Sequence, residues 1–204
     1  MESKKWDDRY AENGYAYGAE PNAFFKYRLD QLSPGKILLP ADGEGRNGVY
    51  AALQGWQSTS FDISIEGQKK ALQLAADLGT TIDYQVGDFQ TMGFQPLSFD
   101  VMALIYAHFP GPVKSDFHQK LSTLVKPGGI VIFEAFSKNH LPIVQANPAV
   151  GGPKDLDTLF SLEELDTDFH DYEVLYRAEE IVTLNEGKYH RGQASVIRFV
   201  GKKH

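Results

Sequence analysis

The sequence predicts an α/β fold in which a mostly parallel sheet has helices on both faces and ends in an antiparallel C-terminal hairpin. Three observations lead to this prediction. Strand-like segments alternate with helical segments from residue 36 to residue 136. A glycine turn, Gly43-Glu44-Gly45, follows the first of these strands. Two long strand-like runs near the C-terminus have only a turn between them, so they should pair antiparallel.

The strands and helices are expected where an apolar pattern ends at a turn or capping residue. Residues 101–105 are apolar throughout, as in a parallel strand buried on both faces. Asn22, Ser64 and Pro112 are typical of helix N-termini. The expected strands are 36–39, 58–61, 81–86, 99–106 and 130–136, and the expected helices are 22–32, 46–54, 65–78 and one that begins at Pro112 and ends before the turn 126–129.

The alternation of strands and helices stops after residue 136. Residues 137–159 are interrupted by prolines and are expected to be irregular. Ser161 and Glu164 have the spacing of a capping box, which predicts a short helix. The runs 172–184 and 193–200 follow, and since no helix fits between them they are expected to form the terminal hairpin.

The turn after the first strand has the residues of a ligand-binding loop. Gly43 and Gly45 permit backbone angles closed to other residues and leave space for a ligand. The helix that begins near Arg46 points its free amide groups toward that space. Asp62 ends the second strand, where a carboxylate can accept hydrogen bonds from both hydroxyls of a ribose. This unit predicts a site for the adenosine half of a cofactor; the alternative is a plain glycine turn and a helix-capping aspartate.

Length and composition narrow the class of protein. The 204 residues suit a single domain, divided into an N-terminal helical lid or cap (1–33), a cofactor-binding core (36–136) and the terminal hairpin (172–200). The absence of cysteine excludes disulfides, thiolate zinc sites and cysteine nucleophiles, and it is typical of a cytoplasmic protein. The N-terminus lacks the apolar segment of a signal peptide, and no apolar run is long enough to span a membrane.

The charge of the chain narrows the class of partner. The formal net charge is −7, which disfavours nucleic acid. No spacing of ligand residues indicates a metal site. We therefore expect a small-molecule substrate and neither a nucleic-acid nor a membrane partner, while monomer and homodimer both stay open.

Short motifs follow one another along the chain. They are W-D-D-R-Y (6–10), Y-G-x-x-P-N (17–22), G-E-G-R-N (43–47), F-D-I-S (61–64), G-D-F (87–89) and L-V-K-P-G-G (124–129). In their order and spacing the chain resembles the class I S-adenosylmethionine-dependent methyltransferases over nearly its whole length. It is most similar to the small bacterial group of tellurite-resistance and thiopurine methyltransferase-like proteins. The resemblance implies a Rossmann-like sheet of seven strands, with the last strand antiparallel and placed beside the fifth.

The resemblance also implies S-adenosyl-L-methionine as the cofactor and gives roles to particular residues. Gly43 and Gly45 would lie under the methionine and ribose parts of the cofactor, and Asp62 would hold the ribose hydroxyls. Ile63 would lie against the adenine, and Asp88 would accept a hydrogen bond from the adenine amino group. The cofactor-binding residues expected in this way are Gly43, Gly45, Arg46, Asp62, Ile63, Asp88, Phe89 and Tyr106.

One departure from the family pattern lies at the end of the first strand. The family has an acid and a glycine where this chain has Leu39 and Ala41. That acid helps to hold the amino group of the cofactor. Asp42 or Glu44 could replace it; the alternative is that both are solvated acids of the turn.

The implied reaction is methyl transfer to a small molecule, with a thiol or a metalloid or chalcogen anion as candidate acceptor. A soft anion needs little acid–base assistance, whereas an alcohol or amine would benefit from a base. The catalytic candidates are His108 and Tyr106, which follow the fourth strand at the edge where ligands bind. His140 and His190 are further candidates for the base, and each histidine has a purely structural role as its alternative.

Two segments outside the core have a double interpretation. The polar cluster at 186–192 is either a loop over the active site or a hydrated hairpin turn. The N-terminal aromatic residues form either a lid that excludes water or a helix packed on the sheet. These aromatic residues are Trp6, Tyr10, Tyr15, Tyr17, Phe24 and Phe25.

Two other functions share the adenosine-binding residues. An NAD(P)-dependent oxidoreductase would also use Gly43, Gly45 and Asp62, but Arg46 and Asn47 occupy the place where a third glycine would approach a pyrophosphate. A non-catalytic protein that binds an adenosyl ligand is the other alternative, and the altered end of the first strand keeps it open.

Overall fold

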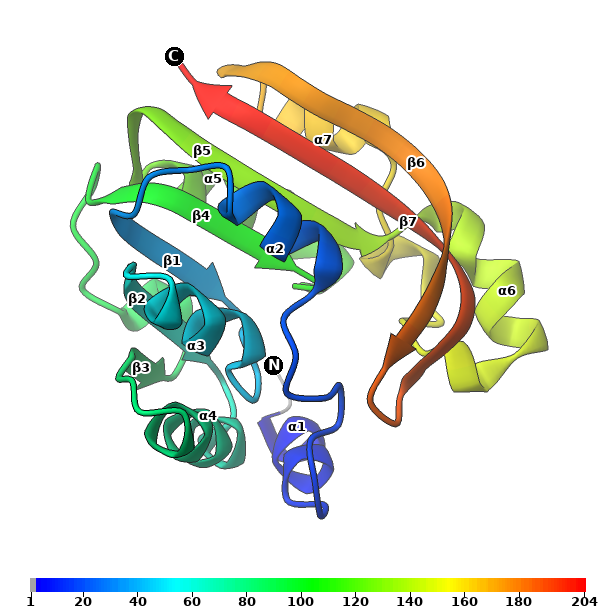
Figure 1. The fold of residues 1–204 in the computed structure, drawn as a ribbon. Helices are drawn as coiled ribbons and strands as arrows, with labels where there is room; N and C mark the ends of the chain where they lie inside the picture. Colours follow the sequence, from blue (N-terminus) through cyan, green and yellow to red (C-terminus); the bar gives the residue numbers. More distant parts are fainter. Residues whose placement is uncertain (1–2) are drawn as a thin grey trace.

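A computed structural model describes residues 3–204, which fold around one sheet of seven strands (Figure 1). The strand order is β3-β2-β1-β4-β5-β7-β6. β7 pairs antiparallel with both β5 and β6, and the other pairs are parallel. This is the predicted fold. The strands are β1 Lys36–Pro40, β2 Gln57–Asp62, β3 Asp83–Val86, β4 Phe99–Ile105, β5 Val125–Phe136, β6 Tyr172–Glu186 and β7 His190–Lys203.

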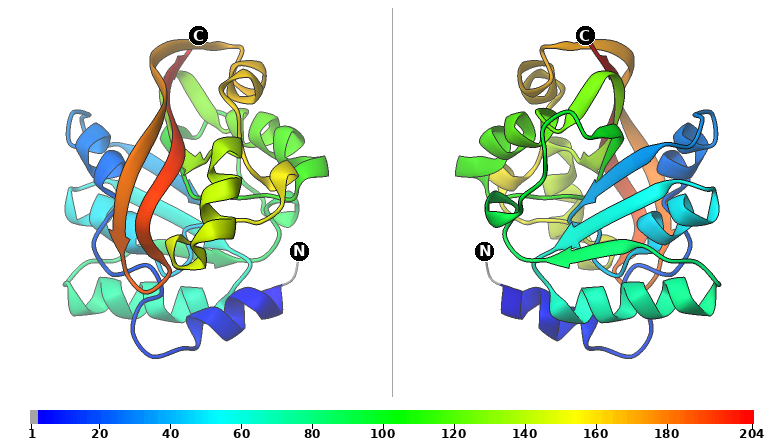
Figure 2. Two further views of the ribbon diagram at one scale, coloured as in Figure 1. Left: turned by 90° about the vertical axis from the view of Figure 1, so that its right-hand side faces the viewer. Right: turned by 90° about the vertical axis from the view of Figure 1, so that its left-hand side faces the viewer.

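Helices cover both faces of this sheet (Figure 2). Short 3-10 helices η1 Phe89–Thr91, η2 Lys138–His140, η3 Pro148–Val150 and η4 Leu156–Thr158 lie in the loops. No helix within residues 3–204 combines the length and the apolar character that crossing a bilayer would require. The α-helices are α1 Ser3–Tyr10, α2 Ala23–Leu29, α3 Arg46–Leu53, α4 Ile65–Asp77, α5 Gly111–Ser122, α6 Leu141–Ala146 and α7 Leu162–Asp168.

Capping side chains fix where several helices begin. The Asn22 side chain accepts a hydrogen bond from the Phe25 amide, and Ser64 accepts one from Gly67. Ser161 and Glu164 form the predicted capping box at the start of α7. Each of these bonds satisfies an amide that a helix start leaves without an internal partner. The helix starts are therefore confirmed, whereas α2 ends three residues before the predicted Leu32.

Alternation along the central strands divides the core between the two faces of the sheet. Leu38, Met102 and Leu104 pack with residues of α5 and α7 on one face. Ile37 and Ala103 pack with residues of α2 and α3 on the other. Since successive side chains of a strand point to opposite faces, β1 and β4 are apolar on both sides. The two layers of helices leave the carboxyl ends of these strands free to carry a site.

Further segments differ from the sequence prediction. β3 begins at Asp83 rather than at residue 81. β5 begins at Val125 rather than at residue 130, because Val125 pairs with Phe99 before the register shifts at the glycine-containing segment. The segment 137–159 contains α6 and 3-10 turns rather than being wholly irregular. The terminal strands extend further than expected on both sides of the turn, and His190 is the first residue of β7.

Candidate active site

A cavity of about 560 Å³ lies at the carboxyl ends of β1, β2 and β4. This volume is typical of sites for small molecules and cofactors. Its walls come from α1, the turn after β1, the tip of β2, the loop after β4 and the start of β7. Of the predicted site residues, it brings together Gly43, Arg46, Asp62, Ile63, Phe89, Tyr106 and His108.

The glycine turn has the conformation that its residues predict. Gly43 and Gly45 have φ of +56° and +81°. A Cβ on Gly43 would lie 2.6 Å from the Tyr10 hydroxyl, and one on Gly45 would lie 2.9 Å from the Cα of Ala71. Gly43 therefore makes room for α1 at the cavity wall. Gly45 instead lets α4 approach, which is a packing role that the sequence pattern does not reveal.

Asp62 joins the tip of β2 to the glycine turn. Its carboxylate accepts hydrogen bonds from the amides of Gly43 and Ser64, both at 3.0 Å. Burial raises the pKa of Asp62 to about 6, against the effect of these bonds. The side chain is fixed in orientation and lines the cavity, so its remaining acceptor positions can serve a ligand.

The two residues expected near the adenine are placed differently. Phe89 lines the cavity and stacks on Phe61, with the ring centroids 5.9 Å apart. Asp88 is exposed and does not line the cavity; its side chain accepts from the Gln90 amide and caps η1. A hydrogen bond from the adenine amino group to Asp88 could therefore form only at the rim of the cavity. One carboxylate oxygen of Asp88 is already used there by the N-cap interaction with Gln90.

Tyr106 and His108 form the wall beyond the end of β4. Tyr106 has φ of +53°, an uncommon conformation for a residue with a side chain. Its ring lies 4.8 Å from Phe136 and 4.6 Å from His190, measured between ring centroids. Burial raises the pKa of Tyr106 well above its usual value, so its hydroxyl keeps its proton.

One ring nitrogen of His108 has a hydrogen-bond partner within residues 3–204, and the other has none. Nδ1 lies 2.9 Å from the carbonyl oxygen of Thr158, whereas buried Nε2 has no hydrogen-bond partner. Burial lowers the pKa of His108 to about 4, so the ring is neutral near pH 7.

The other two candidate histidines have different surroundings. His190 lines the cavity, and its Nδ1 lies 3.1 Å from Glu186. His140 lies outside the lining: Nε2 is 2.9 Å from the Gly151 carbonyl, and Nδ1 accepts from the Ser195 amide. Both nitrogens of His140 are used in holding the chain together, so we assign it a structural role.

Glu186 at the hairpin tip is a site residue without a role in the sequence prediction. Burial alone would raise its pKa, but hydrogen bonding to His190 and the charge of Arg46 lower it to about 2. Arg46 Nη2 lies 2.9 Å from the Glu186 carboxylate. The polar cluster at 186–192 therefore adjoins the cavity, with Glu186 holding the positions of Arg46 and His190.

The N-terminal segment covers the same cavity. Trp6, Arg9, Tyr10 and Tyr17 line it, and Arg9 donates to the Tyr17 hydroxyl at 2.7 Å. α1 lies beside α4 (Figures 1 and 2). Phe24 and Phe25 instead pack in the core, and Tyr15 packs near α4. Trp6, Tyr10 and Tyr17 thus lie where a lid would lie, whereas Phe24, Phe25 and Tyr15 pack against the rest of the fold. Arg9 was missed, although it stands inside the W-D-D-R-Y motif.

The end of β1 is where Leu39 and Ala41 depart from the family pattern, and each has a defined environment or backbone conformation. Leu39 is buried in the core, and Ala41 adopts φ of +53°, where the family has a glycine. Asp42 lines the cavity and accepts from the Gly48 amide at 3.1 Å and the Ser60 hydroxyl at 2.8 Å. Burial raises the pKa of Asp42 to about 7.

Glu44 has a different set of partners, although it also lines the cavity. It accepts from the Ala16 amide at 2.7 Å and pairs with Lys70 at 2.8 Å. These bonds attach the N-terminal segment to the core. Glu44 is thus a structural tie, and Asp42 is the better candidate for the missing acid.

The middle of the chain is similar to a known family of domains. Residues 37–129, slightly less than half of the chain, match the family model Methyltransf_25, described as a methyltransferase domain. The match spans β1, the glycine turn, Asp62 and the loop after β4, which together form most of the cavity wall. It favours the methyl-donor site over the nicotinamide site.

Two curated relatives are similar to part of this chain. One is 2-methyl-6-phytyl-1,4-hydroquinone methyltransferase from Synechocystis sp., 34% identical over 51% of this chain and 33% of its own length. The other is ubiquinone biosynthesis O-methyltransferase from Chromobacterium violaceum, 29% identical over 66% of this chain and 59% of its own length. The chain thus spans between a third and three fifths of the length of these relatives.

Solved structures extend the likeness to the whole chain, at identities that show the fold alone. A structure described as conversion of a disulfide bond into a thioacetal group during echinomycin biosynthesis has a TM-score of 0.78 at 15% identity, and the match covers 100% of this chain and 92% of that one. TehB from Haemophilus influenzae has a TM-score of 0.72 at 18% identity, covering 90% and 62%.

Proposed function

We propose that this chain is an S-adenosylmethionine-dependent methyltransferase that acts on a small molecule. The observation that carries the proposal is the position of Asp62, fixed by the amides of Gly43 and Ser64 in the wall of the main cavity. S-adenosylmethionine is the methyl donor of the matched family. When bound, this cofactor supplies a methyl group made electrophilic by the sulfonium.

The residues of the cavity fit such a cofactor. Asp62 accepts from the ribose hydroxyls, and Ile63 and Phe89 form apolar walls for the adenine. Gly43 exposes backbone beneath the ribose, because any larger residue there would collide with Tyr10. Arg46 begins α3 with its charge balanced by Glu186, and Gly45 positions that helix.

The N-terminal segment acts in this proposal as the cap over the bound cofactor. Lys188 and Tyr189 at the hairpin tip donate their amides to the Ala16 carbonyl, at 2.9 and 3.3 Å. The Tyr189 hydroxyl donates to Glu12 at 2.7 Å, and Lys188 pairs with the same carboxylate. These contacts hold the cap closed between the hairpin and α4, and a closed cap keeps water from the reacting groups.

The acceptor binds in this proposal beyond the end of β4, near Tyr106 and His108. The motifs that resemble the tellurite-resistance and thiopurine methyltransferase-like group support a thiol or a metalloid or chalcogen anion as acceptor. The names of the two curated relatives, a hydroquinone methyltransferase and an O-methyltransferase of ubiquinone biosynthesis, support instead an acceptor with a quinone-related ring, and the second name indicates oxygen as the methylated atom. Neither class needs a macromolecular partner.

Calorimetry of the purified protein tests the cofactor assignment. The protein should bind S-adenosylmethionine and S-adenosylhomocysteine, and NADH and NADPH should produce no binding heat. The opposite preference would contradict the proposal. Formation of S-adenosylhomocysteine with an acceptor then separates an enzyme from a protein that only binds the ligand.

A further inference from the structure

His108 carries a buried acceptor that lacks a donor. A backbone carbonyl can only accept, so the 2.9 Å contact with Thr158 requires that Nδ1 carries the proton. In the neutral ring Nε2 then presents a lone pair, and no donor within residues 3–204 reaches it. Buried polar atoms are nearly always paired in folded proteins, so this atom calls for a donor from outside the described chain, which is either a ligand or a water molecule.

Aromatic rings surround the imidazole of His108. Phe136 stacks on its ring with a centroid distance of 5.7 Å and an interplanar angle of 19°. Phe160 lies on the same ring with a centroid distance of 5.4 Å, and Tyr106 in turn lies 4.8 Å from Phe136. Rings of this kind favour a planar aromatic ligand, because offset and edge-to-face contacts add to the apolar area that is buried.

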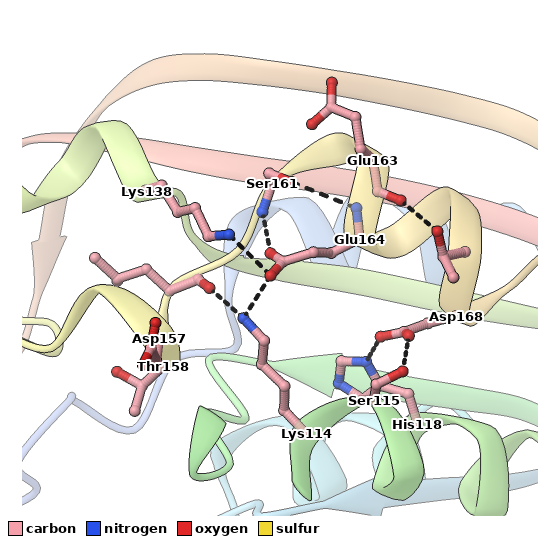
Figure 3. A network of polar contacts seen from close by, with 12 residues as sticks. Lys114, Ser115, His118, Lys138, Asp157, Thr158, Ser161, Glu163, Glu164 and Asp168 are labelled. Atoms are coloured by element: carbon pink, nitrogen blue, oxygen red, sulfur yellow. Dashed lines mark hydrogen bonds and ion pairs between the residues drawn. The ribbon is translucent and has the colours of Figure 1, made fainter. Parts of the chain in front are cut away.

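The neighbouring charges are already balanced. Lys114 of α5 donates to the Leu159 carbonyl at 2.6 Å and pairs with Glu164 of α7 at 3.0 Å (Figure 3). Arg46 pairs with Glu186 across the cavity. The histidines that face His108, His190 of β7 and His140 of η2, have pKa values lowered by burial. An oxyanion beside His108 would thus meet neutral rings, and the charge of Lys114 there is already paired.

We propose that the methyl acceptor is a neutral aromatic hydroxyl compound whose hydroxyl group donates its proton to Nε2 of His108. This rests on the proposed methyl-transfer function. His108 is then a catalytic residue, and Thr158 is the positioning residue that fixes its tautomer. Phe136 and Tyr106 hold the acceptor ring beside the site of transfer.

The proposed step balances in atoms and charge. The acceptor oxygen forms a bond to the methyl carbon of the sulfonium, the carbon–sulfur bond breaks, and sulfur keeps the electron pair. His108 Nε2 takes the hydroxyl proton and becomes an imidazolium, whose Nδ1–H stays bonded to Thr158. The positive charge moves from sulfur to His108, so the cavity holds the same total charge before and after transfer. The proton leaves to water when the ether product departs.

A matched pair of probes tests the proposal on the protein loaded with S-adenosylhomocysteine. We expect 2-naphthol to bind at least about tenfold more tightly than 2-methoxynaphthalene, since the ether leaves Nε2 without a donor. In His108→Phe the ratio should fall to near one. In the control His140→Phe, which also alters a ring stacked on Phe136, the preference should persist.

The outcomes separate the two proposals. Equal affinity for the two naphthalenes, or a preference that survives in His108→Phe, overturns the role of His108. Methylation of tellurite or selenite with no binding of 2-naphthol overturns the acceptor class. Failure to bind S-adenosylhomocysteine counts instead against the proposed function. If His108→Phe does not fold, nitrogen NMR of the wild-type imidazoles decides: 2-naphthol should shift the Nε2 resonance of an Nδ1-protonated His108, and an unmoved resonance overturns the proposal.

Discussion

Arg46 and Glu186 form a buried ion pair at 2.9 Å between the first turn of α3 and the tip of the terminal hairpin. The Arg46 guanidinium also donates to the Tyr17 carbonyl at 3.1 Å, and Glu186 also contacts His190. One pair thus connects the glycine-turn helix, the N-terminal cap and the cavity wall. The hairpin contributes in this way to the site as well as to the sheet.

Glu186→Gln should destabilise the protein, because it leaves the Arg46 charge buried without its partner. We expect a loss of about 3 kcal/mol in the free energy of unfolding, measured with urea at pH 7. The double variant Arg46→Gln, Glu186→Gln should recover part of this loss, since neither charge then remains. A loss below about 0.5 kcal/mol in the single variant would show that the pair is weakly coupled to folding.

Asp42 should make the unliganded protein less stable as pH rises from about 4 to 7, whereas His108, with a folded pKa of about 4, acts in the opposite direction up to about pH 6.5. Asp42 has a folded pKa of about 7 against an ordinary value of 3.8, so the native state binds more protons than the unfolded state in this window. Asp62, with a folded pKa of about 6, adds to the slope. Asp42→Asn should flatten the profile and raise stability at pH 8 by up to about 4 kcal/mol. Urea unfolding across this range measures the slope, and an unchanged slope in the variant would contradict the assignment.

The contact between the cap and the hairpin should control how fast the cofactor leaves. Gly187 has φ of +60°, and a Cβ there would lie 2.5 Å from the Ala16 carbonyl oxygen. Gly187→Ala should separate the hairpin tip from the cap and raise the dissociation rate of S-adenosylmethionine about tenfold, as followed by stopped-flow fluorescence of Trp6. Gly14→Ala is the matched control, with φ of +77° and no atom near the added Cβ. Equal rates in the two variants would count against a cap that gates release.

Local pattern was enough to predict the fold and the cofactor half of the site. The turn at Gly43, the acid at Asp62 and the capping side chains at Asn22 and Ser64 depend on residues close in sequence. The antiparallel hairpin followed from two strand-like runs without a helix between them. These features are fixed by backbone conformation and burial, which short motifs report directly.

The rest depends on contacts between distant segments. Nothing near His108 in the sequence indicates that Thr158 binds its Nδ1, and nothing near Arg46 indicates Glu186. β5 begins at Val125 because Phe99 on the neighbouring strand offers it a partner, although the following Lys-Pro-Gly-Gly segment is typical of a turn. Such pairings arise from tertiary packing, and a single sequence carries no local signal for them.

Asp62 is expected to hold the ribose of S-adenosylmethionine. Calorimetric titration of Asp62→Asn tests this role most directly, with Asp83→Asn as the control, since Asp83 is an exposed acid outside the cavity. Thermal unfolding of both variants confirms that each remains folded. The affinity for S-adenosylmethionine should fall at least about tenfold in Asp62→Asn and stay unchanged in Asp83→Asn. Wild-type affinity in a folded Asp62→Asn protein would contradict this role.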